Sequence, residues 1–195
     1  MKTIILAGGK SSRMGENKAL MKISGMRVID RLIAEFTPIS EEIILITNDP
    51  SLYEGLPVTI VEDCPAYKGH GPLAGIYTGL SAVKNDLCLI VACDLPFASA
   101  QFGRALVNKL REKNSDAVVP QDKEQMHPLF AAYDPRIVEK AEQTLKDGKR
   151  SVKALLDQIH TEWFHIERDE KIVWNMNTQD DYIEAVKLAK GGRNK

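Results

Sequence analysis

The sequence predicts a three-layer α/β domain built on a mostly parallel sheet. Apolar strand segments alternate with amphipathic helical segments along the chain. The early strand segments are continuous apolar runs rather than alternating patterns, which is typical of parallel strands covered on both faces. A length of 195 residues suits one domain of ordinary size, with no internal repeat or low-complexity linker. Together these observations favour stacked β-α-β units.

The first half of the chain alternates between the two kinds of element. Short apolar runs between polar turn residues predict strands, and apolar residues spaced three and four apart predict helices. The expected strands are Thr3–Leu6, Glu42–Thr47, Val58–Val61, Leu87–Ala92 and Asp116–Val119. The expected helices are Met26–Phe36, Pro72–Val83 and Ser99–Lys113.

The second half is more mixed in its patterns. We expect a strand at Leu129–Tyr133 and an edge strand at Trp163–Ile166. The expected helices are Pro135–Leu145, Ser151–Gln158 and Thr178–Ala189. Thr178, with Asp181 three residues later, is a typical cap for the last of them. We expect the domain to span residues 1–190 and residues 191–195 to form a frayed tail.

The bulk composition limits the compartment and the partners. The formal net charge is −1, so no overall basic field draws the chain to nucleic acid or to an anionic membrane. No apolar run approaches the length of a signal segment or a membrane span. Cys64, Cys88 and Cys93 have the spacing of neither a disulfide framework nor a zinc site. These features predict a cytoplasmic protein.

The loop after the first strand carries the strongest chemical signal. Residues 7–18 hold three glycines together with Lys10, Arg13 and Lys18. Glycines let a backbone approach phosphate closely, Arg binds phosphate through two donors, and Lys supplies a point charge. The loop lacks the Walker A lysine, since Glu16 follows its last glycine, and it does not fit G-x-G-x-x-G. It predicts a phosphate site of another kind.

Several polar residues follow predicted strands, and ligands of such sheets bind outside the strands' carboxyl ends. Asp94 ends a buried strand, where a carboxylate either holds Mg²⁺ or shapes a turn. Asp63 follows another strand and either binds a nucleoside or forms a turn. Asn175 and Asn177 alternate along an extended segment, so both can face a metal–phosphate site, although capping the last helix is the plainer role for Asn177.

Glycines also gather at the start of the helix that follows Asp63. Gly71 precedes Pro72, a residue that suits the first helical position. Gly75 and Gly79 lie within the helix, where glycine costs about 1 kcal/mol relative to alanine. Close contact with a ligand explains that cost, and so does packing on the sheet. His127, just before a strand, is either a packed side chain or a substrate contact.

Taken together, these segments resemble the molybdenum cofactor guanylyltransferase family. The resemblance rests on Leu6-Ala7-Gly8-Gly9-x-Ser-x-Arg13-Met14-Gly15-x-x-Lys18, Gly71-Pro72-Leu73-Ala74-Gly75, Cys93-Asp94-Leu95-Pro96 and Asn175-Met176-Asn177-Thr178. The order and spacing agree over nearly the whole chain. Many nucleotidyltransferases share the opening motif, whereas the complete set is more specific. The resemblance implies a Rossmann-like sheet of the nucleotide-diphospho-sugar transferase type.

The resemblance also implies a reaction. GTP and molybdopterin would be the substrates, molybdopterin guanine dinucleotide and pyrophosphate the products, and Mg²⁺ the cofactor. Arg13, Lys18 and Asp94 would be catalytic, and Asp94 would bind the metal. The site would be lined by Leu6, Ala7, Gly8, Gly9, Lys18, Asn48, Asp63, Gly71, Gly75, Asp94, Asn175 and Asn177. Transient contact with other proteins that make or accept the cofactor would follow, without nucleic acid or membrane.

Two other classes of function stay open on the sequence. A cytidylyltransferase for molybdopterin, or a sugar-phosphate nucleotidyltransferase, would share the fold and differ in a few loop contacts. A non-catalytic nucleotide-binding regulator or carrier would need neither Lys18 nor Asp94. The acceptor phosphate is already anionic, so transfer needs no general base. Charge stabilisation and positioning are then the main catalytic tasks.

Overall fold

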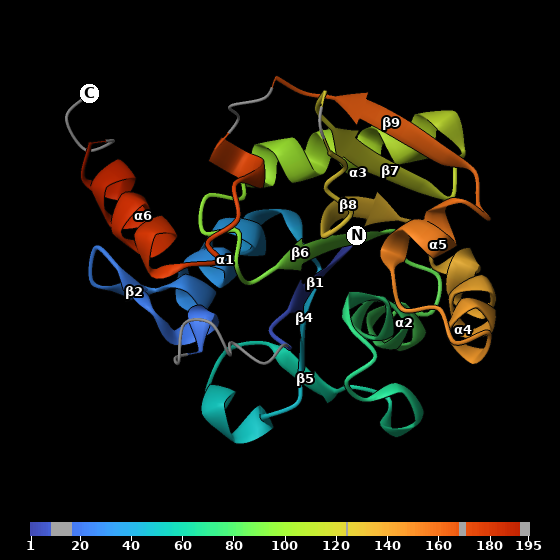
Figure 1. The fold of residues 1–195 in the computed structure, drawn as a ribbon, viewed down its shortest axis with the longest axis horizontal. Helices are drawn as coiled ribbons and strands as arrows, with labels where there is room; N and C mark the ends of the chain where they lie inside the picture. The colour runs from blue at the N-terminus through green and yellow to red at the C-terminus, as the bar shows by residue number, and fades with distance from the viewer. Residues whose placement is uncertain (9–16, 124, 168–170, 192–195) are drawn as a thin grey trace.

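A seven-stranded sheet, in the order β5-β4-β1-β6-β8-β7-β9, runs through the centre of the molecule (Figure 1). The computed structural model describes residues 1–8, 17–123, 125–167 and 171–191. Neighbouring strands are parallel except β8, which is antiparallel to both β6 and β7. The predicted mostly parallel α/β sheet is confirmed, with β9 at one edge as expected.

The seven strands of the sheet agree with the predicted strands to within a few residues, whereas β2 and β3 were not predicted. The strands are β1 (Lys2–Leu6), β2 (Lys22–Ile23), β3 (Met26–Arg27), β4 (Glu42–Thr47), β5 (Thr59–Glu62), β6 (Cys88–Ala92), β7 (Ala117–Gln121), β8 (Phe130–Tyr133) and β9 (Thr161–His165). The α-helices are α1 (Val28–Phe36), α2 (Pro72–Ala82), α3 (Ala100–Lys113), α4 (Val138–Lys146), α5 (Val152–Leu156) and α6 (Gln179–Gly191). None of these helices is long and apolar enough to cross a membrane, within the residues described.

Helices cover both faces of the sheet, which explains the continuous apolar strands (Figure 1). Ile5 and Leu89 belong to a core that also contains side chains of α1 and α3. Ile4 and Ile90, their neighbours along the same strands, belong to a second core with α2, α4 and α5. Successive side chains of a strand point to opposite faces, so each central strand contributes to both cores.

The prediction of a helix from Met26 is wrong at its start. Met26 and Arg27 form β3, which pairs with β2 in a short antiparallel hairpin, and α1 begins at Val28. Gly25, with φ of 88°, makes the tight turn between the two strands. Met26 has the spacing of the helix's apolar face, yet it is 46% exposed. Apolar periodicity alone therefore predicts a helix that starts too early, because it takes no account of the turn at Gly25.

The register of the sheet brings several strand ends to one edge. Leu6, the last residue of β1, is paired with Ile46 of β4 and Ala92 of β6. The residues that follow these strands therefore leave the sheet side by side. Because β8 is antiparallel, its first residue Phe130 lies at this same edge, paired with Val91. The carboxyl edge is thus lined by strand ends from the parallel part and by the segment that enters β8.

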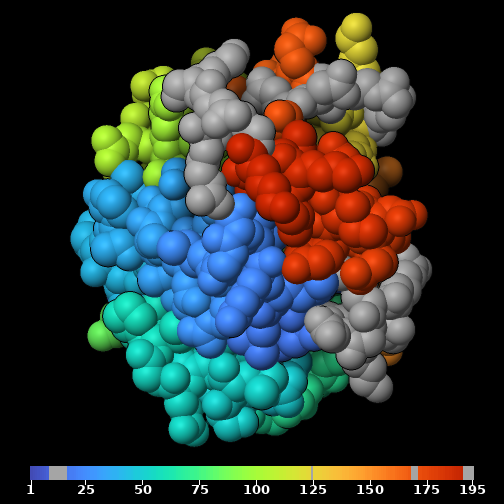
Figure 2. All heavy atoms as spheres, turned by 90° about the vertical axis from the view of Figure 1, so that its left-hand side faces the viewer, coloured from blue at the N-terminus to red at the C-terminus, as the bar shows by residue number. Residues whose placement is uncertain are grey.

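The C-terminal helix packs beside the N-terminal hairpin. Figure 2 shows α6, in red, next to the blue segment that contains β2 and β3. The Tyr182 hydroxyl donates a hydrogen bond of 2.9 Å to the backbone oxygen of Lys22. Thr178 Oγ1 accepts from the Asp181 N–H, and Asp181 Oδ2 accepts from the Thr178 N–H, at 3.1 and 2.7 Å. The predicted reciprocal cap is therefore present.

Candidate active site

Lys18, Asp94 and Asn177 meet at the carboxyl edge of the sheet. The Lys18 ammonium lies 3.9 Å from Asp94 Oδ2 and donates a hydrogen bond of 2.7 Å to Asn177 Oδ1. The lysine and aspartate side chains are 17% and 23% exposed. Lys18 begins a 3₁₀ turn capped by Asn17, whose side-chain oxygen accepts from the Ala19 N–H. Three separate segments thus place a cation, a carboxylate and an amide at one point.

The Asp94 carboxylate has an incomplete environment. Burial raises its pKa, and the nearby Lys18 ammonium offsets only part of that rise. Asp94 Oδ1 is buried and has no hydrogen-bond partner among the described residues. A buried carboxylate oxygen without a partner is costly, so this atom is an acceptor suited to a bound cation or donor. The Met176 N–H donates to the Asp94 backbone oxygen at 2.8 Å and ties the segment before α6 to this residue.

The donor set at Asp94 fits magnesium. Mg²⁺ commonly takes one or two protein carboxylates and completes its shell with water and substrate phosphates. The described residues hold no group of three or more His, Cys, Asp or Glu side chains that could enclose a metal. A metal held at Asp94 would therefore take its remaining ligands from water or from substrate phosphates.

A second polar pair lies further along the same edge. The Asn48 amide nitrogen donates to Asp63 Oδ2 at 2.8 Å, which joins the residues that follow β4 and β5. Asn48 Oδ1 and Asp63 Oδ1 are both buried without a hydrogen-bond partner among the described residues. A Cβ atom placed on Gly8 would lie 3.7 Å from the side chains of both residues. The pair therefore leaves two acceptor oxygens next to the glycine that follows β1.

The two glycines inside α2 pack on the sheet. A Cβ atom on Gly79 would lie 2.7 Å from the Ile4 side chain, so a side chain there displaces the core. A Cβ atom on Gly75 would lie 3.3 Å from Leu6 and 3.9 Å from Asp63 Oδ1. Close helix–sheet packing accounts for Gly79. Gly75 combines packing on β1 with a position beside the Asp63 carboxylate.

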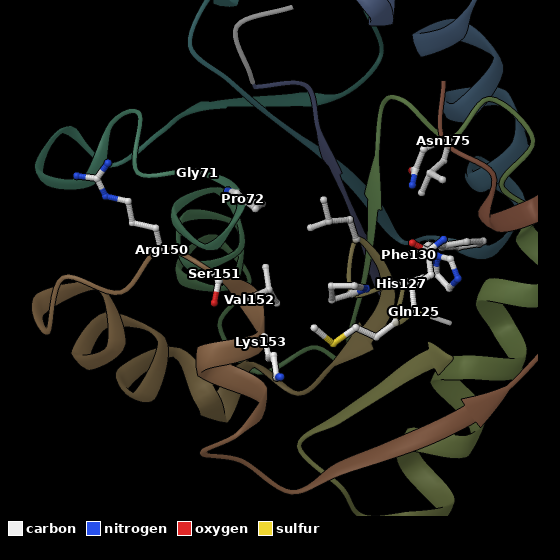
Figure 3. A pocket seen from close by; sticks show the side chains of 14 residues that line it. Gly71, Pro72, Gln125, His127, Phe130, Arg150, Ser151, Val152, Lys153 and Asn175 are labelled. Carbon is white, nitrogen blue, oxygen red and sulfur yellow. The ribbon is translucent and has the colours of Figure 1, made fainter. Parts of the chain in front are cut away.

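A cavity of about 580 Å³ opens beside the segments that carry Asp94 and Asn177. Figure 3 shows it between the starts of α2 and α5 on one side and the segment before β8 on the other. Its lining is formed by Gly71, Pro72, Leu95, Gln125, Met126, His127, Pro128, Leu129, Phe130, Arg150, Ser151, Val152, Lys153 and Asn175. Leu95 follows Asp94 directly, and Asn175 is two residues from Asn177. The cavity is therefore connected to the Lys18–Asp94 centre through the segments that carry Asp94 and Asn177.

The structure gathers the predicted site residues into two neighbouring groups. Lys18, Asp94 and Asn177 form one, with Gly71 and Asn175 in the adjoining cavity. Gly8, Asn48, Asp63 and Gly75 form the other. The Leu6 backbone oxygen accepts from the Cys93 N–H, and the Ala7 N–H donates to the Ile46 backbone oxygen. These two backbone groups of Leu6 and Ala7 therefore already have hydrogen-bond partners within the protein. Gly9 and Arg13 lie outside the described residues.

Most of the residues that line the cavity were not predicted from the sequence. Arg150, Ser151 and Lys153 line it from the start of α5, a segment that we treated only as a helix. Asp122 was missed as well. Its Oδ2 atom lies 3.1 Å from Nε2 of His127, which lines the cavity. Asp122 follows β7 directly, so the rule that identified Asp63 and Asp94 would have identified it too, had the strand not been ended at Val119.

Nucleotidyltransferases form the class that this fold and site define, with a cation and a carboxylate at the carboxyl edge of a mostly parallel sheet. The family described as the MobA-like NTP transferase domain matches residues 3–162. The chain belongs to that family.

Relatives of the chain agree over almost its full length. It is 35% identical, over 94% of both chains, to a probable molybdenum cofactor guanylyltransferase of Bacillus cereus strain G9842. A protein of the same description from Bacillus anthracis strain CDC 684 is also 35% identical, over 94% of both chains. The crystal structure of molybdopterin-guanine dinucleotide biosynthesis protein A from Archaeoglobus fulgidus superposes with a TM-score of 0.87 at 22% identity, covering 98% of this chain and 100% of that one. The structural likeness confirms the fold.

Proposed function

We propose that this chain transfers GMP from GTP to the phosphate of molybdopterin. The observation that carries the proposal is the Lys18–Asp94 pair, whose carboxylate has a free buried oxygen, at the sheet edge that also holds the Asn48–Asp63 pair and close to the cavity. The names of the curated relatives support the same substrates. An acceptor phosphate oxygen bonds to the α-phosphorus of GTP, and the bond from that phosphorus to the β-phosphate oxygen breaks. Pyrophosphate leaves with the electron pair, and the dinucleotide remains.

Charge stabilisation is the main task of the residues around the reacting phosphorus. Lys18 is held by Asn177 at 2.7 Å, so its ammonium is fixed where negative charge would develop on the leaving phosphates. Asp94 would hold Mg²⁺, which neutralises phosphate charge when bound. Arg13, in the glycine-rich loop, would bind the same phosphates through two donors. Lys18 and Asn177 come from opposite ends of the chain and together position the transferred group.

The Asn48–Asp63 pair supports guanine as the donor base. Asn48 Oδ1 and Asp63 Oδ1 are two buried acceptors without partners among the described residues. Guanine presents two neighbouring donors, the N1–H and the 2-amino group, whereas cytosine presents one amino donor beside acceptors. Two acceptors matched to two donors satisfy buried oxygens that would otherwise remain unpaired. The missing side chains of Gly8 and Gly75 keep the backbone close to these residues, since a Cβ atom on Gly8 would lie 3.7 Å from both and one on Gly75 would lie 3.9 Å from Asp63 Oδ1.

A nucleotide panel with molybdopterin, scored by pyrophosphate release, tests the proposal. GTP should support turnover, and CTP should compete poorly. Preference for CTP would make the chain a cytidylyltransferase instead. Release with a sugar phosphate in place of molybdopterin would change the acceptor. Tight GTP binding without pyrophosphate release would favour a carrier or regulator, and turnover that needs no divalent metal would remove Mg²⁺ from the proposal.

We also place the reaction in the cytoplasm. The three cysteines are free thiols, which are typical of a reducing compartment. Burial raises the pKa of both Cys88 and Cys93 to about 12, which suits inert packed thiols rather than reactive ones. Transient contact with proteins that supply or accept the pterin remains part of the proposal.

A further inference from the structure

The wall of the cavity contains a buried histidine–carboxylate pair. His127 Nε2 lies 3.1 Å from Asp122 Oδ2, and the two side chains are 7% and 5% exposed. His127 lines the cavity, opposite the segment that starts α5 (Figure 3). Buried polar side chains are costly unless they are paired, so this pair has a structural or a ligand-binding reason to be here.

The pair is held rigidly by its own loop. Asp122 Oδ1 accepts from the Gln125 N–H at 2.9 Å, and the Asp122 N–H donates to the Gln125 oxygen at 3.0 Å. The His127 N–H donates to the Pro120 oxygen at 2.8 Å. Both members of the pair are therefore fixed to the end of β7, and the imidazole has a defined orientation in the cavity wall.

The carboxylate decides which ring nitrogen is left for a ligand. An ionised carboxylate only accepts hydrogen bonds, so the proton on this side of the ring is carried by Nε2 of His127. In the neutral imidazole Nδ1 is then a hydrogen-bond acceptor. Asp122 thus fixes Nδ1 as the acceptor of a ring that lines the cavity, in the way that a carboxylate orients a metal-binding histidine.

The rest of the cavity indicates what that acceptor would meet. Met126, Pro128, Leu129 and Val152 give it largely apolar walls, suited to a flat ring system. Its lining also includes Leu95, next to Asp94 in the sequence, and Asn175, two residues before Asn177. A ligand with its phosphate at Lys18 would therefore place its far end in this cavity. A nitrogen-rich heterocycle carries ring N–H and amino donors that Nδ1 can accept.

We propose that His127 is a specificity-determining contact of the acceptor substrate, and that Asp122 is the positioning residue that orients it. The Nδ1 atom accepts a hydrogen bond from an N–H of the acceptor's heterocycle, while the acceptor phosphate lies at Lys18 and Asp94. This inference rests on the proposed function for the identity of the acceptor. It adds a recognition group at the end of the acceptor far from the reacting phosphate.

Two substitutions of His127 separate this role from a structural one. The side-chain amide of glutamine reaches the place of Nε2, so His127→Gln keeps a donor toward Asp122 and loses the acceptor. The shorter amide of asparagine reaches the place of Nδ1, so His127→Asn keeps an acceptor and loses the bond to Asp122. A substrate contact predicts that asparagine is the better replacement. If His127 instead serves only to hold Asp122 and its loop, glutamine should be the better replacement.

The measurement is steady-state turnover of both variants with GTP, Mg²⁺ and anaerobically prepared molybdopterin. We expect His127→Gln to raise the KM for molybdopterin at least tenfold, with kcat and the KM for GTP within twofold of the parent. His127→Asn should keep the KM for molybdopterin within threefold. The matched controls are the same two substitutions at His160, whose side chain is 62% exposed and lies 3.7 Å from Glu162. They should change nothing. The reverse ranking, or equal losses at His127, would overturn the inference.

Direct binding keeps the inference distinct from the proposed function. Molybdopterin is titrated against the parent protein and both His127 variants without nucleotide, by quenching of intrinsic fluorescence. The same ranking of affinities without any turnover would refute GMP transfer and leave the role of His127 standing. Failure of the parent to bind molybdopterin would overturn the inference.

Asp122→Asn covers the case in which the His127 variants do not fold. Its amide nitrogen can donate to Nε2 and so move the ring proton to Nδ1, which turns the cavity acceptor into a donor. The KM for molybdopterin should rise at least fivefold with the KM for GTP unchanged. An unchanged KM for molybdopterin would count against Asp122 as the positioning residue.

Discussion

The two halves of the site are built differently. On the nucleoside side, Asn48 and Asp63 follow consecutive parallel strands and bond to each other at 2.8 Å. On the cavity side, His127 precedes an antiparallel strand and bonds to a residue of its own loop. The first half is a direct result of parallel topology, in which carboxyl ends share an edge. The second half depends on the reversal of β8 and on loop lengths.

The difference assigns the halves different tasks. Phosphate and nucleoside recognition, as proposed, uses residues at strand ends that the sheet holds in register. Acceptor recognition, as proposed, uses a cavity between a loop and two helix starts, where sequence can vary without disturbing the sheet. Lys18, Asp94 and Asn177 lie between the two halves. Substitutions in the three regions should therefore separate chemistry from recognition.

Replacing Lys18 should give the largest effect, because its ammonium serves the reacting phosphates rather than either recognition half. We expect Lys18→Ala to lower kcat by about a thousandfold, at the upper end for loss of one electrostatic stabiliser. The measurement is pyrophosphate release at saturating GTP and molybdopterin. The control is Lys22→Ala, an exposed lysine four residues on, which should keep full activity. Near-parental turnover in Lys18→Ala would remove the lysine from the mechanism.

Asp94→Asn should lower turnover by about a hundredfold and raise the thermal stability at pH 7. Burial raises the pKa of Asp94, so folding disfavours its ionised form. That penalty is present above the raised pKa and disappears as the pH falls and the carboxyl becomes protonated. The stability gain of the variant should therefore shrink between neutral and acidic pH in thermal melts followed by circular dichroism. A variant less stable than the parent at pH 7 would contradict this account.

The nucleoside half was largely predictable from the sequence. Asp63 and Asp94 stand directly after apolar runs, and parallel register places such residues together without any knowledge of side-chain contacts. Gly8 and Gly75 were identified from the same strand–loop–helix pattern. The bond between Asn48 and Asp63 was not, because the sequence does not give the register in which the last residue of β4, Thr47, pairs with the last residue of β5, Glu62.

The cavity half was predictable only in fragments. His127 was noticed as a residue before a strand, but its partner and its burial depend on the direction of β8 and on the turn at Asp122–Gln125. The involvement of Arg150 follows from α5 packing beside α2, a long-range contact without a sequence signature. Met26 is the opposite case, because here the sequence contains a clear signal that is misleading. Its apolar periodicity predicts a helix, but the turn at Gly25 places it in β3.

Asp63→Asn tests whether the nucleoside half sets the base preference. The amide can still accept from Asn48, but it then presents a donor where an unpartnered acceptor stood. A reversed hydrogen bond costs about 1–3 kcal/mol, so kcat/KM for GTP should fall about tenfold while the KM for molybdopterin stays unchanged. The control is Asp49→Asn, an exposed aspartate at the same edge. A selective change in the KM for molybdopterin would reverse the assignment of the two halves.

The smallest effect tests the segment that joins the halves. Asp181 Oδ2 accepts from the backbone N–H of Asn177 at 2.8 Å, and the side chain of Asn177 holds Lys18. Although burial acts to raise the pKa of Asp181, these backbone donors hold it below its usual range. Its stabilising effect is therefore present at neutral pH and lost as the pH falls through the folded pKa.

Asp181→Asn should lower kcat three- to fivefold and lower the melting temperature at pH 7 but not in acid. Asp180→Asn removes the same charge from the same helical turn and should leave kcat unchanged. Equal losses in both variants would mean that Asp181 acts only through its charge at the start of the helix and does not help to position Lys18.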